Sequence, residues 1–236
     1  MHRYRIQDNI RTKFDGSPLT IADLESHSTI IKALLPFGIP IVSEEDFTSR
    51  QVNAHSCYWL IDPLDGTKDF LAENDEFTIN LALVENGRPI MGIVYAPALS
   101  ELYFGSVYRP AVKIINGVSM PWKSIQKRTT LKMAISRFHD CPKSTEFATK
   151  NHIEDRTPIG AALKYVKIAF GDIDVYPRMV GTSEWDTAAG QAILESVGGS
   201  MYDISTKMPI VYGKYNYRNS NFVAFRFPYK FEDFIW

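Results

Sequence analysis

The chain has 236 residues, of which 45% are hydrophobic and 22% charged, with a formal net charge of -1, so we expect no disordered, fibrous or nucleic-acid-binding protein. Its length allows one large domain or two small ones. Its two cysteines, Cys57 and Cys141, form no CxxC pair, which suits a reducing compartment, and no apolar run reaches the roughly 18 residues of a membrane span. We expect a cytoplasmic protein without a transmembrane segment, and we leave peripheral membrane association open.

The first predicted element is an amphipathic helix within residues 17–38. A Ser-Pro turn opens the segment, and Gly38 marks its end. Thr20 and Asp23 fit a capping box at the start of the helix, with Thr20 as the cap and the acid three residues later. The apolar face is predicted from the helical spacing of Ile21, Leu24, Ile31 and Leu35.

Strands dominate the rest of the first half. Two apolar runs, residues 39–43 and 58–61, predict buried strands that end in carboxylates. Residues 77–97 predict a β-hairpin, because the pair Asn86-Gly87 between two β-rich runs is the signal of a type I′ turn. Residues 101–107 predict one more strand.

The polar stretch at residues 120–130 is the candidate boundary between two halves, which we place at 1–125 and 126–236. Strands and helices alternate after it, whereas the first half groups its strands together. We expect strands at 131–136 and 173–178 and helices at 161–171 and 185–199, the helices closed by glycines. The fold class is therefore α/β, with an α+β first half, an α/β second half and layered sheets.

The most informative motif is DPLDGT, residues 62–67. Magnesium prefers oxygen ligands in octahedral array, so Asp62, Asp65 and the Leu64 carbonyl could share such an ion. Gly66 would let the backbone approach an anion closely. An isolated motif of this kind fits equally well a solvated turn in which Asp65 caps the following helix.

Two other chain segments offer acids to the same site. Glu44 and Glu45 end the preceding predicted strand, and Asp186 opens a later predicted helix. Alone, Asp186 also fits a residue that favours the helix dipole. Haloacid-dehalogenase-type phosphatases use an acid-rich loop as well, but one residue rather than two separates their aspartates, so the spacing here disfavours an aspartyl-phosphate mechanism.

With these motifs the chain resembles the inositol monophosphatase superfamily. The DPLDGT and WDTAAG motifs are specific to the superfamily, while the run through KDF and GIVYAPA resembles its CysQ-type 3'(2'),5'-bisphosphate nucleotidases. The resembling stretches cover nearly everything from residue 11 onward: KFDGSPLTIAD, IVSEED, YWLIDPLDGTKDF, EFTINLALVENGRPIMGIVYAPA, ISRFH, GAALK, DVYPR and WDTAAG. The resemblance implies a layered αβαβα sandwich of the inositol monophosphatase and fructose-1,6-bisphosphatase type.

The implied function is a Mg²⁺-dependent phosphatase that hydrolyses the 3'-phosphate of 3'-phosphoadenosine 5'-phosphate to AMP, and acts also on 3'-phosphoadenylyl sulfate, by metal-activated water. The resemblance implies two or three Mg²⁺ ions per site, sensitivity to lithium and a setting in sulfur metabolism. The small phosphorylated substrate is the expected partner. Monomer and homodimer both stay open.

The resemblance also assigns roles to residues of this chain. Thr67 and Asp23 together would activate water. This role replaces the capping role considered for Asp23. Glu44 is the third implied catalytic residue. The implied metal ligands are Glu44, Asp62, Leu64, Asp65 and Asp186. The implied substrate contacts are Leu64, Asp65, Gly66, Thr67, His139, Lys164, Arg178 and Asp186. Of these, Lys164 and Arg178 would face the second phosphate of a bisphosphate, although both also fit ordinary solvated charges.

The chain departs from the family pattern in two places. Ala161-Ala162 stands where the family has Ser-Ser, which removes two hydroxyl donors to a phosphate. The long first helix of the family is not evident before Lys13 and Asp15, which the family places near the metals, so one sheet face is expected to be uncovered. These departures keep two alternatives open: an inositol or sugar monophosphatase, and a catalytically impaired metal- or nucleotide-binding homologue that lacks the first helix.

Overall fold

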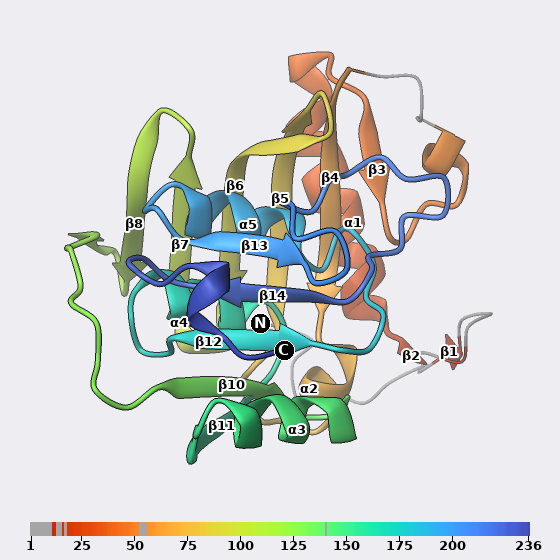
Figure 1. The fold of residues 1–236 in the computed structure, drawn as a ribbon. Coiled ribbons are helices and arrows are strands. Elements are labelled where there is room, and N and C mark those ends of the chain that lie inside the picture. The colour runs from red at the N-terminus through yellow and green to blue at the C-terminus, as the bar shows by residue number, and fades with distance from the viewer. Residues whose placement is uncertain (1–10, 13–15, 17, 52–55, 140) are drawn as a thin grey trace.

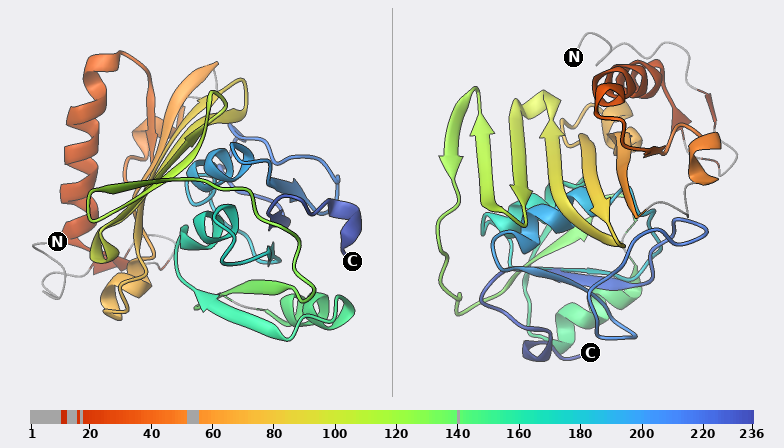
Figure 2. Two further views of the ribbon diagram at one scale, coloured as in Figure 1. Left: turned by 90° about the vertical axis from the view of Figure 1, so that its left-hand side faces the viewer. Right: turned by 90° about the horizontal axis from the view of Figure 1, so that it is seen from above.

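The computed structural model describes residues 11–12, 16, 18–51, 56–139 and 141–236. The chain is folded into five layers, in the order helix, sheet, helices, sheet, helix (Figures 1 and 2). The mixed α/β class and the predicted αβαβα arrangement are confirmed. Among the described residues, no helix is long and apolar enough to cross a membrane.

The first sheet has seven strands in simple sequence order from β3 to β9. Only β3 and β4 pair in parallel, and every later pair is antiparallel. The predicted hairpin of β5 and β6 is confirmed, since Asn86 and Gly87 have φ of 49° and 76°, as a type I′ turn requires. The strands are β3 (Ile41–Ser43), β4 (Cys57–Asp65), β5 (Thr78–Glu85), β6 (Arg88–Ala96), β7 (Glu101–Ser106), β8 (Arg109–Ile115) and β9 (Val118–Pro121).

Helix α1 (Ile21–Leu34) lies on the outer face of this sheet against β3 and β4 (Figure 2). The predicted helix and its end are confirmed: a short 3-10 turn, η1 (Leu35–Phe37), follows, and Gly38 has φ of 65°. The predicted apolar face is partly wrong, because Leu24 is 42% and Leu35 64% exposed. In the described part of the chain α1 is the one long helix on this face, and apolar side chains of β6 and β7 there are only half-buried.

Helices α4 (Leu163–Ala169) and α5 (Ala188–Glu195) fill the layer between the two sheets. Small residues on three neighbouring strands form a shallow trough for α5: Ala82 pairs with Gly92, and Gly92 pairs with Gly105. A Cβ on Gly92 would come within 2.2 Å of the Ala189 carbonyl oxygen of the helix. The close approach of α5 to the sheet therefore depends on the absence of side chains there.

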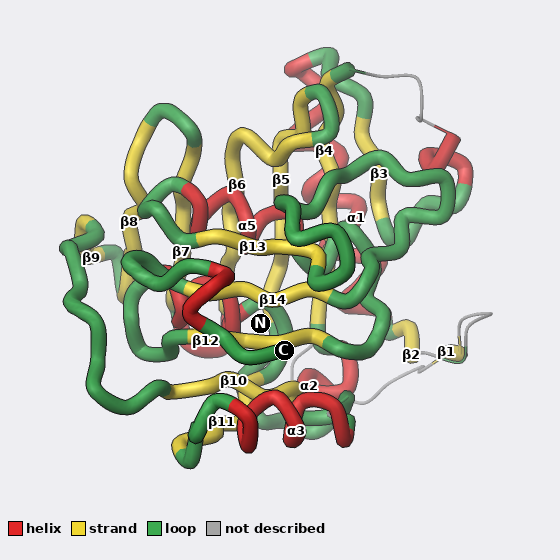
Figure 3. Tube along the Cα trace, viewed as in Figure 1, coloured by secondary structure: helices red, strands yellow, loops and turns green. Residues whose placement is uncertain are grey.

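The second sheet has five strands in the order β11-β10-β12-β14-β13, and helix α3 lies on its outer face (Figure 3). The predicted strands β10 and β12 are confirmed, while α3 and the other three strands were not predicted. The elements are β10 (Lys132–Ser136), α3 (Pro142–Lys150), β11 (Asp155–Ile159), β12 (Val175–Arg178), β13 (Ser200–Asp203) and β14 (Phe222–Phe225). The remaining short elements are β1 (Arg11–Thr12), β2 (Pro18–Leu19), α2 (Thr67–Leu71), η2 (Thr48–Gln51), η3 (Pro97–Leu99) and η4 (Phe231–Asp233).

The main hydrophobic core lies between the two sheets and takes side chains from both. Leu60 and Val94 come from the first sheet, Leu163 and Ile193 from the helices, and Phe222 from the second sheet. This cluster contains residues from both sides of the boundary at residues 120–130, where the two halves of the chain meet in the sequence. The halves therefore share the main core, while a smaller buried cluster around Phe147 and Phe225 belongs to the second half alone.

Candidate active site

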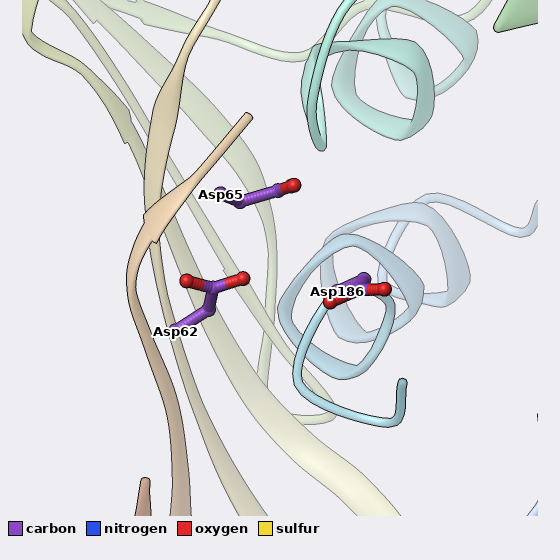
Figure 4. Close-up of side chains that lie close together, drawn as sticks. All are labelled: Asp62, Asp65 and Asp186. Atoms are coloured by element: carbon purple, nitrogen blue, oxygen red, sulfur yellow. The ribbon is translucent and has the colours of Figure 1, made fainter. Parts of the chain in front are cut away.

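The DPLDGT loop is placed by an irregularity in strand β4. Its pairing with β5 is regular up to Asp62 opposite Asn80 and resumes at Asp65 opposite Thr78. In a regular strand, residues three apart point to opposite faces of the sheet. The bulge re-aims the chain, so that Asp62 and Asp65 both point into one space (Figure 4).

Asp186 reaches the same space from the start of α5 (Figure 4). Carboxylate oxygens of Asp62, Asp65 and Asp186 all lie within 4.8 Å of one another. The backbone N–H of Ser183 donates to Asp186 Oδ2 at 2.8 Å and holds that side chain in place. The predicted meeting of distant acidic chain segments is therefore present in the structure.

Glu44 lies beside this cluster at the end of β3, where its backbone N–H donates to the Ile61 carbonyl at 3.2 Å. Because β3 and β4 run parallel, the residues that follow them come out at the same edge of the sheet. A hydrogen bond with Glu44 and the charge of Glu44 both raise the pKa of Asp62. Four carboxylates thus share the site.

Burial makes the ionised state of these acids unfavourable without a counter-charge. Asp62 is 1% exposed, and its pKa is raised well above the usual range, first by burial and then by the neighbouring acids. Burial and the charge of Asp65 raise the pKa of Asp186 likewise. Burial raises the pKa of Asp65 to about 6, although Lys164 opposes the rise. A cluster of hard oxygen donors that repel one another fits a divalent cation such as Mg²⁺.

Asp23 makes contacts that fit both of the roles considered for it. Its Oδ2 accepts hydrogen bonds from the Thr20 backbone N–H at 2.7 Å and the Thr20 hydroxyl at 2.6 Å, at the start of α1. Its Oδ1 lies 3.5 Å from the Thr67 hydroxyl, which can donate its one proton either to it or to the Leu64 carbonyl at 3.4 Å. The two oxygens of one fully buried carboxylate therefore serve the helix and the DPLDGT loop separately.

A cavity of about 480 Å³ opens over the acidic cluster, within the usual range for small-molecule sites. Every predicted site residue except Asp23 lines it, and Asp23 lies behind Thr67. Lys13 and Asp15 lie outside the described residues. The predicted residues around the cavity are Glu44, Asp62, Leu64, Asp65, Gly66, Thr67, His139, Lys164, Arg178 and Asp186.

The cations Lys164 and Arg178 are buried in the cavity wall, 6% and 8% exposed, which argues against ordinary solvated charges. Lys164 Nζ donates to the Ala161 and Ile159 carbonyls at 2.6 and 3.2 Å. Arg178 Nε donates to the Val180 carbonyl at 2.8 Å. Burial lowers the pKa of Lys164 to about 8, with Asp65 acting in the opposite direction. Neither cation contacts a carboxylate among the contacts described.

His139 lies across the cavity, where its Nε2 is 3.3 Å from Lys68 Nζ. Partial burial, and then the positive charges of Lys68, Arg178 and Lys164, lower its pKa to about 4. The imidazole is therefore neutral near pH 7, and it can donate or accept a hydrogen bond without adding charge.

Ala161 and Ala162 contact the β4 loop and strand β5. A Cβ on Gly66 would lie 3.1 Å from the Ala161 Cβ, and the Ala162 backbone N–H donates to the Thr78 hydroxyl at 3.4 Å. The segment that departs from the family pattern is therefore packed tightly against DPLDGT. It supplies backbone atoms, but no hydroxyl groups, to the cavity wall.

The sequence analysis assigned no individual role to several residues of this cavity. Arg137 Nη2 pairs with Glu76 at 2.6 Å, and Arg137 Nε lies 3.5 Å from buried Asp69, all beside the loop. Arg218 also lines the cavity. Asp69 follows DPLDGT closely enough to have been considered, whereas Arg218 lies in an irregular segment without a recognisable motif.

The pattern of the inositol monophosphatase family matches residues 1–231. The chain is 42% identical over 196 residues to the 3'(2'),5'-bisphosphate nucleotidase CysQ of Salmonella typhimurium, covering 81% of this chain and 78% of that protein. It is 39% identical over 200 residues to the protein of the same name from Escherichia coli K12, covering 83% and 80%. The solved CysQ structure from Bacteroides thetaiotaomicron superposes with a TM-score of 0.81 and 34% identity, over 91% of this chain and 86% of that one.

Proposed function

The chain belongs to the inositol monophosphatase family, and from that premise we propose that it is a phosphatase of the 3'(2'),5'-bisphosphate nucleotidase type. It removes the 3'-phosphate of a small nucleotide such as 3'-phosphoadenosine 5'-phosphate and leaves AMP. Relatives named for this activity, about 40% identical over four-fifths of the chain, favour it over inositol or sugar phosphates. The observation that carries the proposal is a cluster of buried and half-buried carboxylates, with separate buried cations, around one cavity.

Two or three Mg²⁺ ions are part of the proposal. Glu44, Asp62, Asp65, Asp186 and the Leu64 carbonyl would hold them, which explains why acids with raised pKa values are buried together. When bound, such ions acidify a water molecule and neutralise charge on the phosphoryl and leaving oxygens. A catalytically impaired homologue has less support, because each of these ligand types is retained at the cavity.

The proton of the attacking water would pass to the chain itself. When the Thr67 hydroxyl donates to Asp23 rather than to the Leu64 carbonyl, its oxygen lone pairs are left to accept a hydrogen bond from a water in the cavity. Thr67 can then take the water proton while it gives its own to Asp23. Thr20 holds the Asp23 carboxylate through two bonds and so keeps it in position.

The substrate would be held at two ends. Gly66 and Thr67 would contact the phosphate that is cleaved, while Lys164 and Arg178 face the rest of the cavity as cations without a carboxylate partner among the described contacts. Neutral His139 would contact the nucleoside. The partner is thus a small phosphorylated molecule, and the proposed location is the cytoplasm, with monomer and homodimer both open.

A phosphate-release panel tests the proposal. The purified protein is assayed with 3'-phosphoadenosine 5'-phosphate, inositol 1-phosphate and a sugar phosphate, each with Mg²⁺ and with a chelator, and with added Li⁺. We expect Mg²⁺-dependent release from the bisphosphate to exceed that from the other two substrates, and Li⁺ to inhibit it. Faster release from inositol 1-phosphate would replace the nucleotidase assignment with the first alternative.

The Asp62→Asn variant tests whether the acidic cluster is responsible for phosphate release. Asp62→Asn keeps the side-chain shape but removes one charge from the cluster. Since the loss of residues that merely support a metal ligand costs about 10–100-fold in activity, we expect the loss here to reach at least the upper end of that range. Background turnover in the wild type with saturating Mg²⁺, together with measurable nucleotide binding, would favour the impaired homologue.

A further inference from the structure

The basic residues around the cavity differ in what already occupies their donors. Arg137 is paired with Glu76 and Asp69. Lys164 and Arg178 are buried and donate to main-chain carbonyls. Arg218 is exposed, and its guanidinium makes one described hydrogen bond, from Nη1 to the Ser183 hydroxyl at 3.1 Å. Most of its five N–H donors therefore remain available to an anion.

The backbone around Arg218 is fastened to the segment that carries Asp186. Ser183 and Arg218 form an isolated antiparallel bridge. The side-chain amide nitrogen of Asn219, which is buried, donates to the Ser183 carbonyl at 2.9 Å and to the Thr187 hydroxyl at 2.9 Å. Arg218 thus has a defined place relative to the acidic cluster, although it comes from a distant part of the chain.

Two guanidinium groups, those of Arg178 and Arg218, lie close to Gly181 in the cavity wall. Arg178 Nη2 lies 3.5 Å from the Gly181 carbonyl oxygen. On Gly181 itself, an added Cβ would lie 3.4 Å from Arg218 Nη2. Gly181 therefore lies between a buried and an exposed arginine, both of which line the cavity.

A nucleoside bisphosphate requires two anion sites of different character. The cleaved phosphate belongs at the carboxylate cluster, where a divalent cation compensates the charge. The second phosphate is repelled by that cluster and needs donors that no carboxylate neutralises. An arginine with free donors on a fixed backbone suits it, because the guanidinium fork binds phosphate through two parallel hydrogen bonds.

We propose that Arg218 binds the second, uncleaved phosphate and so selects bisphosphorylated over monophosphorylated nucleotides. This inference rests on the proposed nucleotidase function. It adds a specificity-determining residue to that function, beside the segment that carries Asp186. Arg178 supports the same phosphate from the buried side of Gly181.

A matched pair of substrates tests the proposal. Adenosine 3',5'-bisphosphate and adenosine 3'-monophosphate carry the same cleavable ester, and only the first has the second phosphate. We expect Arg218→Ala to raise KM for the bisphosphate about 10–100-fold, as loss of charge-assisted hydrogen bonds does, and to leave kcat and the monophosphate reaction nearly unchanged. Arg218→Lys keeps the charge but not the fork, so a smaller shift in the same direction is expected.

Inhibition by the product gives a second readout that does not depend on turnover of the monophosphate. AMP retains the second phosphate, so its inhibition constant should rise in Arg218→Ala by a similar factor, whereas that of adenosine should not change. Arg109→Ala, on an exposed strand start remote from the cavity lining, is the matched control and should change neither constant. Melting temperatures compared across all variants show whether they fold.

The other possible outcomes show whether the role of Arg218 or the nucleotidase function itself is wrong. Equal effects of Arg218→Ala on both substrates, or no effect on either, would show that the inference is wrong while the nucleotidase function stands. The same holds if Lys68→Ala, and not Arg218→Ala, raises KM for the bisphosphate selectively. Should Arg218→Ala fail to fold, an Arg218→Lys variant without a substrate-selective shift overturns the inference. A wild-type protein that releases no phosphate from the bisphosphate with Mg²⁺ overturns the proposed function itself.

Discussion

At the scale of single residues, the Thr67 hydroxyl joins the DPLDGT loop to Asp23 behind it. Thr67→Val removes the hydroxyl and keeps the shape of the side chain, whereas Thr67→Ser restores the hydroxyl. Because a positioned proton-transfer group contributes about 10²–10⁴-fold, we expect kcat to fall by such a factor in Thr67→Val and to recover largely in Thr67→Ser. Steady-state phosphate release measures both.

The stabilisation of each Thr67 variant by Mg²⁺ provides the control. Since the Thr67 side chain is not among the proposed metal ligands, the rise in melting temperature on adding Mg²⁺ should match that of the wild type. A Thr67→Val variant with normal kcat would exclude Thr67 from water activation. A variant that no longer responds to Mg²⁺ would show that its role is to shape the metal site.

The raised pKa of Asp65 predicts how the stability of the metal-free protein depends on pH. Its pKa is raised from 3.8 to about 6, first by burial. Between these values the folded state binds more protons than the unfolded state, so this contribution to stability is fully present below pH 3.8 and is lost as pH rises through about 6. Melting temperatures in excess chelator should show this fall, and Asp65→Asn should reduce it.

Added Mg²⁺ should act in the opposite direction. Metal binding requires ionised carboxylates, so stabilisation by Mg²⁺ should be larger at neutral pH than at acidic pH. If chelated wild type and chelated Asp65→Asn show the same pH dependence between pH 3.8 and 6, the Asp65 carboxyl is not responsible.

At the scale of elements, local signals predicted those segments whose structure depends on near neighbours. The Asn86-Gly87 turn and the helix that ends at Gly38 are examples, because turn chemistry and helix termination act over a few residues. Helix α3 and strand β11 were missed because both are rich in polar residues. Strand β11 is also stabilised by its pairing with β10, which the local sequence does not show. The exposure of Leu24 was missed because helical spacing cannot show how far a sheet extends beneath a helix.

The candidate site divides in the same way. DPLDGT was recognisable because its acids, glycine and hydroxyl are adjacent in the sequence. The bulge in this motif could not be predicted, because the shift in register between Asp62 and Asp65 shows only when β4 is paired with β5. Arg218 was missed for a related reason: an isolated bridge to Ser183 and the Asn219 amide bring it to the cavity, and neither leaves a local pattern.

The trough beneath α5 is the element-scale feature most open to test. A methyl group on Gly92 would meet the backbone of Ala189 at 2.2 Å, and a backbone cannot move aside as a flexible side chain can. We therefore expect Gly92→Ala to cost about 3 kcal/mol of unfolding free energy, the upper end for overpacking. That corresponds to a fall of roughly 6–12 °C in melting temperature for a chain of this size.

Ser119→Ala on the exposed strand β9 is the control for Gly92→Ala and should leave the melting temperature nearly unchanged. The two variants can be compared by thermal melting under the same chelated conditions. A Gly92→Ala protein as stable as the wild type would mean that α5 does not rest on the sheet as closely as described.

At the scale of the whole molecule, the two halves of the chain are joined by shared packing, and a buried ion pair holds the second half together. Helix α5 belongs to the second half, yet it packs against β5, β6 and β7 of the first. Asp174 Oδ1 accepts from Arg226 Nε at 2.6 Å and from Arg128 Nη1 at 3.2 Å, and Arg226 also donates to the Gln126 carbonyl. The connection between the sheets is therefore fastened to the second sheet rather than free.

This arrangement predicts that the protein unfolds as one cooperative unit. Separation of the halves would expose the core faces of α5 and of the first sheet together, so both halves would lose the main core, although the second half keeps a smaller cluster of its own. Calorimetry in excess chelator should give one transition, with a calorimetric enthalpy equal to the van't Hoff enthalpy. Two resolved transitions would instead make residues 1–125 and 126–236 independent domains.

Asp174→Asn weakens the second half alone and so tests whether the first half unfolds together with it. The substitution leaves the buried Arg226 without its carboxylate, which typically costs about 3–5 kcal/mol. If packing in the shared core couples the halves, the single transition moves to lower temperature but does not split. If the transition splits, the second half unfolds without the first, and the shared core does not couple them.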